Sequence, residues 1–214
     1  MKENYLKIIF VIDESGSMQG TESDVVGGFN HFIEEQKKAE FGKITVSLYK
    51  FNSQWSRVVN DLPIDEIRPL TSDDYTPGGL TALYDTIGNA IVDIQNQTHY
   101  TDPAHQASMV IMVVITDGQE NASIEYDSRK VKEMIRELEL SKNWQFIYLG
   151  ADLKNFADAE TLGLSHKVSS RKSDLKQKFD VIAEHSIKIM SAEPSADQYT
   201  MMQDFVEDLG KDAD

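Results

Sequence analysis

Cysteine is absent from the 214 residues of the chain. Its absence excludes a disulfide scaffold, a thiolate metal site and a cysteine nucleophile, and it fits a reducing compartment such as the cytosol. Basic residues are also scarce, because 21 Lys and Arg stand against 36 Asp and Glu and give a formal net charge of −15. Such a field repels nucleic acid and anionic membrane surfaces, so we expect neither as a partner.

Long hydrophobic runs are missing too. The apolar run at residues 8–12 ends at Asp13, too early for the core of a secretory signal, and no small-residue cleavage site follows it. The other long run, residues 109–115, is far shorter than the roughly 20 residues of a membrane span. We therefore expect a cytoplasmic protein.

Hydrophobic residues make up 40% of the chain, enough for one sizeable core. Continuous apolar segments at 6–12 and 109–115, with a third at 147–150, predict strands buried on both faces, as in parallel sheets covered by helices. Apolar residues recur at helical spacing in several further segments. These segments are residues 25–33, 83–94, 131–138 and 175–189.

One strand is expected to run against the others. Apolar residues alternate over 44–48, and the polar link Asn52-Ser53-Gln54 then leads to a second candidate strand at 55–62, which indicates a hairpin. Elsewhere strands and helices alternate, which implies right-handed crossovers. The prediction is a doubly wound α/β domain over residues 1–192, with one antiparallel edge strand. The acidic residues 193–214 are predicted to form a tail or a short helix, with Phe205 and Leu209 as docking residues.

Polar segments stand where the predicted parallel strands end, and ligands of open α/β sheets bind at that edge. Asp13-Glu14-Ser15-Gly16-Ser17 follows the first strand, and Thr116-Asp117-Gly118 follows the strand at 109–115. Between them, just before a helix, lies Pro77-Gly78-Gly79-Leu80-Thr81. The glycines permit the tight turns that such loops need.

These segments offer two carboxylates and three hydroxyls, the oxygen ligands that a hard divalent cation such as Mg²⁺ prefers. The candidate metal residues are Asp13, Ser15, Ser17, Thr81 and Asp117. The alternation of positions 13, 15 and 17 lets every other side chain of a tight loop face one point.

The three segments resemble the metal-ion-dependent adhesion site of von Willebrand factor A (VWA) domains. The residues around them, 11–18 and 78–83, resemble the stand-alone bacterial and phage branch of that family, and the resemblance covers residues 6–190. It implies a mostly parallel, six-stranded, Rossmann-like sheet with helices on both faces. It also implies that the five residues above hold Mg²⁺, or Mn²⁺, with Ser15 and Ser17 as direct ligands and Asp13 and Asp117 acting partly through water.

By the same resemblance, the open coordination position takes an Asp or Glu side chain of a partner protein. The chain is then a binding module and not an enzyme, and an AAA+ ATPase is a candidate partner, because some bacterial VWA proteins work beside such ATPases. We expect specificity to come from loops around the site. These are residues 18–24, 75–78, 97–107 and 119–126, with Gln119-Glu120-Asn121 facing the partner.

Other interpretations remain open at this point. Asp13 and Ser17 would suit capping of the first helix, and Thr81 capping of the next. A Mg²⁺-dependent phosphate-ester hydrolase with Asp13 as nucleophile is the second functional hypothesis, although Ser15 stands where that chemistry needs a second aspartate. A weaker hypothesis places a second metal site at His99 and His105.

Overall fold

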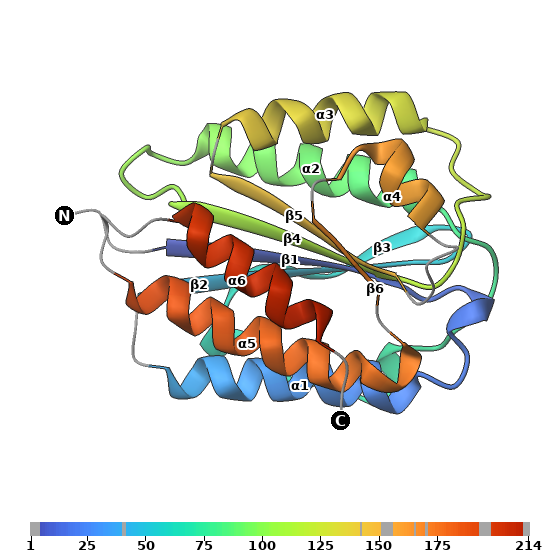
Figure 1. Cartoon of the computed structure of the whole chain (residues 1–214), viewed down its shortest axis with the longest axis horizontal. Helices are drawn as coiled ribbons and strands as arrows, with labels where there is room; N and C mark the ends of the chain where they lie inside the picture. The colour runs from blue at the N-terminus through green and yellow to red at the C-terminus, as the bar shows by residue number, and fades with distance from the viewer. Residues whose placement is uncertain are drawn as a thin grey trace.

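The computed structural model describes residues 5–39, 42–141, 143–150, 156–164, 166–169, 171–192 and 198–211. A sheet of six strands lies between two layers of helices (Figure 1). The strands are β1 (Tyr5–Asp13), β2 (Lys43–Phe51), β3 (Trp55–Pro63), β4 (Met109–Thr116), β5 (Trp144–Gly150) and β6 (His166–Ser169). Their order across the sheet is β3-β2-β1-β4-β5-β6.

The pairing confirms the predicted fold class. β1 pairs in parallel with both β2 and β4, and the parallel ladder continues through β5 to β6. Only the edge strand β3 is antiparallel, because the short link at 52–54 turns the chain straight back along β2. The strand order reverses at β1 and β4, so the loops that follow these two strands define the switch point where ligands of such sheets bind.

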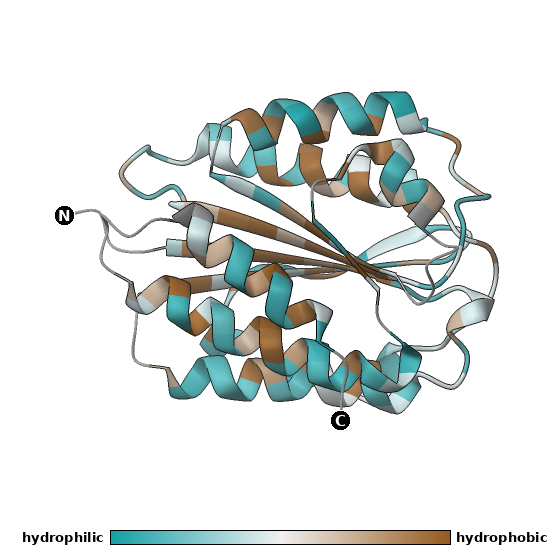
Figure 2. Cartoon of the chain, viewed as in Figure 1, coloured by the Kyte–Doolittle hydropathy of each residue, from teal (hydrophilic) through white to brown (hydrophobic). Residues whose placement is uncertain are grey.

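Two helical layers cover the sheet (Figure 1). Helices α1 (Glu22–Lys38), α5 (Leu175–Ser191) and α6 (Gln198–Gly210) cover one face, and α2 (Leu83–Tyr100), α3 (Ser128–Leu140) and α4 (Phe156–Leu162) cover the other. Successive side chains of β1 enter opposite cores, because side chains alternate across a strand. Phe10 packs with the first layer, whereas Ile9 and Val11 pack with the second. Both faces of the central strands are therefore apolar, and Figure 2 shows these strands largely in brown, the colour of hydrophobic residues.

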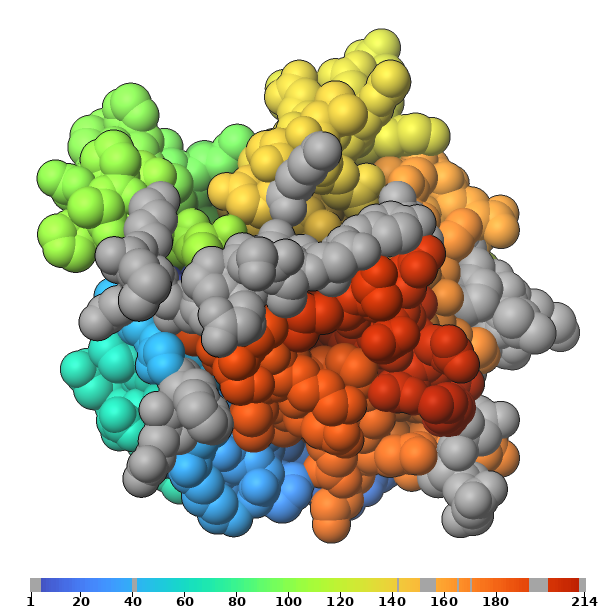
Figure 3. All heavy atoms as spheres, turned by 60° about the vertical axis from the view of Figure 1, so that its left-hand side comes forward, coloured from blue at the N-terminus to red at the C-terminus, as the bar shows by residue number. Residues whose placement is uncertain are grey.

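The acidic end of the chain forms a helix within the described residues. In Figure 3, α6 (red) lies across α5 (orange), which in turn packs beside α1 (blue). Phe205 and Leu209 are fully buried, and the ring of Phe205 stacks on His185 of α5 with centroids 4.9 Å apart. The boundary drawn after residue 192 stays a prediction. None of the described helices combines the length and the apolar character needed to cross a membrane.

The loop at 97–107 lies at the wrong end of the sheet for the predicted role. Helix α2 begins beside the carboxyl ends of the parallel strands and runs for 18 residues, about 27 Å at 1.5 Å per residue, to the opposite end. There Ser108, just before β4, accepts a hydrogen bond from the backbone of Tyr5 at the start of β1. In Figure 1 this loop (green) projects at the left, whereas the carboxyl ends of the parallel strands lie at the right. The expectation that it flanks the metal residues is wrong.

Candidate metal centre

Three loops meet at the carboxyl ends of β1 and β4, and backbone hydrogen bonds join two of them. Gly78 N donates to Glu14 O at 2.8 Å, and Gly16 N donates to Gly79 O at 3.2 Å. Gly79 has a φ of +84°, and a Cβ there would lie 2.8 Å from Ser53 Oγ. Glycine is therefore needed at this position, because it alone adopts such a φ without strain and leaves space for the neighbouring loop.

The hydroxyl and carboxylate oxygens of these loops form a continuous chain. Ser15 Oγ lies 2.9 Å from Ser17 Oγ, and Ser17 Oγ donates to Asp117 Oδ1 at 2.6 Å. Ser15 is buried, whereas Ser17 is exposed at the open side of the cluster. Residues that are 100 positions apart in the sequence thus share one hydrogen-bonded group.

Asp13 lies at the base of the cluster with no exposed surface. Its Oδ1 accepts a 2.7 Å bond from the Ser15 amide, and its Oδ2 accepts a 2.5 Å bond from the hydroxyl of Thr116. Burial raises the pKa of Asp13 and the negative charge of Asp117 raises it further, while the bonds from Thr116 and Ser15 lower it. A nearby cation would remove this cost of burying negative charge.

Thr81 completes the cluster beside Gly118. A Cβ placed on Gly118 would lie 3.0 Å from Thr81 Oγ1, 3.1 Å from Asp13 Oδ2 and 3.3 Å from Ser17 Oγ. Oxygens from the end of β1, from the segment that follows it and from the segment before α2 therefore converge beside Gly118 of the third loop, on a space slightly too small for a methyl group. The structure thus brings together all five residues predicted to bind metal, and their oxygens suit a hard divalent cation. That they bind one stays a prediction.

Helix capping does not account for these residues. The N-cap of α1 is Thr21 and that of α2 is Ala82, and neither makes a side-chain capping bond. Thr81 precedes the cap of α2, and Asp13 is the last residue of β1. The capping interpretation is therefore wrong.

A cationic side chain that sequence reasoning missed also reaches the cluster. Lys172, in the 3₁₀ turn η5 (Lys172–Asp174) before α5, places its Nζ 2.5 Å from Asp117 Oδ2 and donates to the backbone carbonyl of Ser17. Thr116, which holds Asp13, was missed as well. The signal for Thr116 was its position next to Asp117, whereas nothing in the sequence points to Lys172.

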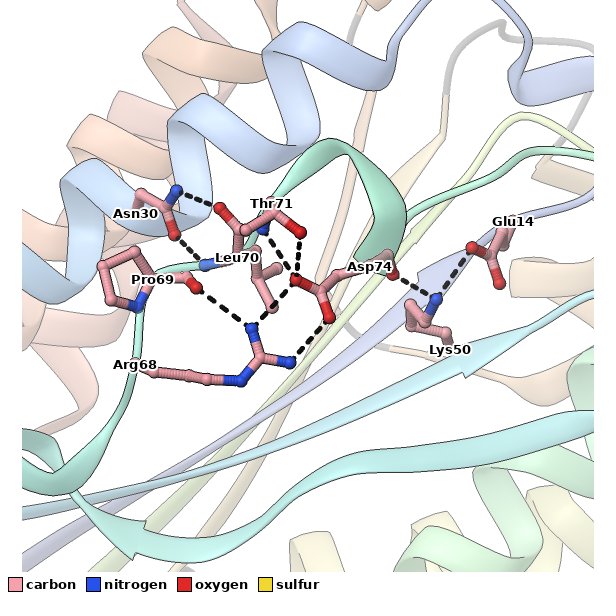
Figure 4. A network of polar contacts seen from close by, with 8 residues as sticks. All are labelled: Glu14, Asn30, Lys50, Arg68, Pro69, Leu70, Thr71 and Asp74. Atoms are coloured by element: carbon pink, nitrogen blue, oxygen red, sulfur yellow. Dashed lines mark hydrogen bonds and ion pairs between the residues drawn. The ribbon is translucent and has the colours of Figure 1, made fainter.

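A polar network holds the segment that leads to Thr81 (Figure 4). Lys50 of β2 donates to Glu14 Oε1 at 2.8 Å and to the backbone carbonyl of Asp74. The Asp74 carboxylate in turn accepts two bonds from Arg68 and two from Thr71. The guanidinium of Arg68, followed by the amide and hydroxyl of Thr71, holds the pKa of Asp74 well below its usual range. Glu14, in the candidate metal segment 13–17, is thereby linked to the segment that leads to Thr81.

The loop at 119–126 is attached to the start of α2 by carboxylates that bind backbone amides. Asp85 accepts the amides of residues 124, 125 and 126, and Glu120 accepts those of residues 84, 122 and 123. The carboxylate of Glu120 is therefore used by backbone amides of the loop and of α2, and the expectation that residues 119–121 face a partner stays a prediction. Asn121 Oδ1 likewise accepts the amide of Thr81. The exposed hydrophobic residue of the loop is Ile124, which is 95% exposed.

No second metal site is found around His99 and His105. Within the described ranges, no three or more His, Cys, Asp or Glu side chains are grouped so that they could hold a metal ion. His99 instead packs edge-on against Tyr100 with ring centroids 5.1 Å apart.

The fold and this loop cluster define a class of protein, a doubly wound α/β domain with an oxygen-lined site at its switch point. The profile of the von Willebrand factor type A domain family matches residues 7–209, through helix α6. The chain therefore belongs to the VWA family. No curated protein matches the sequence.

Solved structures agree with this fold at low sequence identity. The PilB minor pilin from Streptococcus sanguinis aligns with a TM-score of 0.66 and 15% identity, over 89% of this chain and 64% of that one. The von Willebrand factor domain of the pilus tip protein Mfa5 from Porphyromonas gingivalis gives 0.59 and 12%, over 92% and 99%. Proximal thread matrix protein 1 from the mussel byssus, solved with zinc in its metal-ion-dependent adhesion site, gives 0.54 and 15%, over 86% and 46%. The chain thus spans less than two thirds of the pilin and less than half of the mussel protein.

Proposed function

We propose that this chain is a metal-dependent protein-binding module and not an enzyme. In this proposal one divalent cation is held by Asp13, Ser15, Ser17, Thr81 and Asp117, and it takes an Asp or Glu carboxylate from a partner protein. The convergence of oxygens of Asp13, Ser17 and Thr81 on the space beside Gly118, where three loops meet, is the observation that carries the proposal. Family membership supports it, because VWA domains are known for metal-dependent adhesion and protein binding.

The hydrogen bonds suggest how the roles divide. The Ser17 hydroxyl already donates its proton to Asp117, and the Thr116 hydroxyl donates to Asp13, so both aspartates act as acceptors within the protein. We assign Ser15, Ser17 and Thr81 as ligands through their hydroxyl oxygens, and Asp13 and Asp117 as the source of negative charge, partly through water. When bound, the cation supplies the positive charge that draws a carboxylate toward a chain of net charge −15.

Mg²⁺ is the proposed metal, and Mn²⁺ the expected substitute. The mussel protein has zinc in the corresponding motif. Zinc sites in proteins, however, are built largely from nitrogen and sulfur ligands, whereas the donors here are all hard oxygens that suit Mg²⁺ and Mn²⁺.

For partner and location we propose a cytoplasmic module of bacterial or phage type that works beside another protein. The lack of cysteine supports this location. A partner that presents an acidic residue, with AAA+ ATPases as one candidate, fits a module that has no phosphate-binding loop of its own. Residues 18–24, 75–78 and 119–126 border the site and would supply specificity.

The geometry favours this function over a phosphate-ester hydrolase that uses Asp13. A nucleophile needs an accessible oxygen, but Asp13 has no exposed surface and both of its carboxylate oxygens accept hydrogen bonds. Ser15, in the place of the second aspartate, is hydrogen-bonded to Ser17 and supplies no acid.

The first test is calorimetric titration with Mg²⁺ and with Mn²⁺. Wild type is expected to bind one ion per chain, and the double variant Ser15→Ala/Ser17→Ala is expected to bind none. Ser56→Ala, on the exposed side of β3, is the matched control and should bind like wild type. A double variant with wild-type affinity would overturn the proposed ligand set.

The second test is affinity capture from cell lysate, with wild type in Mg²⁺, wild type in EDTA, and the double variant in Mg²⁺. A protein retained only in the first sample supports metal-mediated binding. Retention of the same proteins in all three samples would mean that the chain binds them without the metal. That result would refute the proposed metal-mediated binding.

A further inference from the structure

Lys172 is the cationic side chain that reaches into the candidate metal centre. Its Nζ lies 2.5 Å from Asp117 Oδ2 and also donates to the carbonyl of Ser17, so one ammonium contacts two of the three loops that carry predicted ligands. Asp117 uses its other oxygen, Oδ1, for the Ser17 hydroxyl. The ammonium thus neutralises the negative charge of Asp117, the same charge that a divalent cation in the site would interact with.

The turn that carries Lys172 is held in place independently of the metal residues. Arg171 Nε donates to Asp174 Oδ2 at 2.9 Å, and the Asp174 side chain is only 4% exposed. Leu175 and Lys172 line a small cavity of about 10 Å³ together with residues of η1 (Gly16–Met18) and the end of β4. The backbone at 171–174 therefore presents Lys172 to the site, while its long side chain stays 40% exposed and has space to turn outward.

We infer that Lys172 is an internal cation that opposes the divalent metal, and so sets the affinity and the charge selectivity of the site. This inference rests on the proposed metal site. An ammonium and a divalent cation within a few ångströms of each other repel strongly where water is partly excluded. Metal binding must therefore break the contact of Lys172 with Asp117, and the free energy of that contact is subtracted from the affinity.

The same contact discriminates between cations by charge. A monovalent ion brings no more charge than the ammonium already supplies, so it gains little by displacing it. A divalent ion brings twice that charge to the two aspartates, Asp13 and Asp117. Its attraction to them therefore exceeds the free energy lost when the contact between Lys172 and Asp117 is broken. Lys172 thereby excludes Na⁺ and K⁺ from the site while it only weakens the binding of Mg²⁺ or Mn²⁺.

The experiment measures Mg²⁺ and Mn²⁺ affinity by calorimetry for wild type, Lys172→Met and Lys188→Met. Lys188 lies on α5, is paired with Glu184 at 2.8 Å and is 50% exposed, so its substitution makes the same charge change away from the site. Lys172→Met is expected to bind both metals about tenfold more tightly, since the lost pair joins a half-exposed lysine to a buried carboxylate. Lys188→Met should bind like wild type, and Lys172→Arg, which keeps the charge, should stay within about twofold of wild type.

A second readout separates this role from a purely structural one. Without metal, Lys172→Met should melt at a lower temperature than wild type, because Asp117 loses its contact with the ammonium group of Lys172. In saturating Mg²⁺ the difference should disappear, so the variant shows the larger metal-induced shift. Lys172→Gln, which keeps a donor for the Ser17 carbonyl but no charge, serves if the methionine variant fails to fold.

Equal or weaker metal binding by Lys172→Met, with wild type binding normally, would overturn the inference and leave the proposed function intact. Weaker binding would assign Lys172 to holding Asp117 in position. Failure of all variants and of wild type to bind metal would instead overturn the proposed metal site itself, and this inference with it.

Discussion

Substitution of Gly118 by alanine tests the central geometric claim, that oxygens of Asp13, Ser17 and Thr81 converge on one small space beside this residue. The added methyl group would lie 3.0 to 3.3 Å from Thr81 Oγ1, Asp13 Oδ2 and Ser17 Oγ, closer than carbon and oxygen normally approach. The backbone itself tolerates alanine, because Gly118 does not have a positive φ. We therefore expect a folded protein whose metal centre is blocked.

Two opposing effects set the stability of the metal-free variant. Crowding lowers the free energy of unfolding by about 1–3 kcal/mol. Replacing glycine reduces the entropy of the unfolded chain and raises the free energy of unfolding by about 0.4–1 kcal/mol, so we expect it to fall by about 1–2 kcal/mol in total. For wild type, metal at 100 times its Kd stabilises by about 2.7 kcal/mol. In a domain of this size that corresponds to a rise in Tm of about 5–10 °C.

The assay is a thermal melt in EDTA and in saturating Mg²⁺ for wild type, Gly118→Ala and Gly27→Ala. Gly27 is the matched control, since it is exposed on α1 and a Cβ there meets nothing within 4 Å. Gly27→Ala should keep the full Mg²⁺ shift and be about 0.5–1 kcal/mol more stable, as expected for alanine in a helix. Gly118→Ala should show no shift. A wild-type shift in Gly118→Ala would refute the view that the space beside this residue is the metal position.

Three further substitutions have defined outcomes. Thr116→Val removes the hydroxyl that holds Asp13 and should weaken Mg²⁺ binding about tenfold by calorimetry, whereas unchanged affinity would remove Thr116 from the site. Asp74→Asn should lower the free energy of unfolding by about 1–2 kcal/mol at pH 7. Because the pKa of Asp74 is lower in the folded than in the unfolded state, its carboxylate stabilises the fold above the unfolded-state pKa, and this stabilisation is lost as the pH falls. In urea titrations the free energies of unfolding of wild type and variant should therefore converge between about pH 5 and pH 2. Gly28→Ala places a methyl group 2.4 Å from the ring of Phe179. It should lower the free energy of unfolding, measured in urea, by about 2–3 kcal/mol. A decrease below about 0.5 kcal/mol would show that α1 and α5 can move apart without strain.

The fold was largely predictable because its signals are local. The apolar runs at 6–12 and 109–115 become β1 and β4, which are buried on both faces, and the link at 52–54 joins the antiparallel pair β2 and β3 as expected. The grouping of Asp13, Ser15, Ser17 and Asp117 followed from one topological rule, that parallel strands end at the same edge of the sheet. Thr81 follows no such strand, and its place in the group came from the resemblance to VWA domains. No contact needed to be known in advance.

What sequence reasoning missed depends on how distant segments meet. Lys172 reaches Ser17 across 155 positions, and no local pattern encodes that approach. The loop at 97–107 was assigned to the site by its place between two site segments, but the length of α2 carries it to the other end of the sheet. Glu120 looked like a partner contact because it is an acidic residue in a loop, whereas its carboxylate is used by backbone amides.

The loop at 119–126 is attached in a way that bears on how such a surface can evolve. Asp85 and Glu120 hold it mainly through main-chain amides, which every residue except proline possesses. The shape of the loop therefore depends mainly on these two carboxylates and not on the side chain of Ile124. Ile124, which is 95% exposed, can therefore change identity by single mutations while the loop keeps its course, so new binding preferences can arise at this edge without a loss of stability.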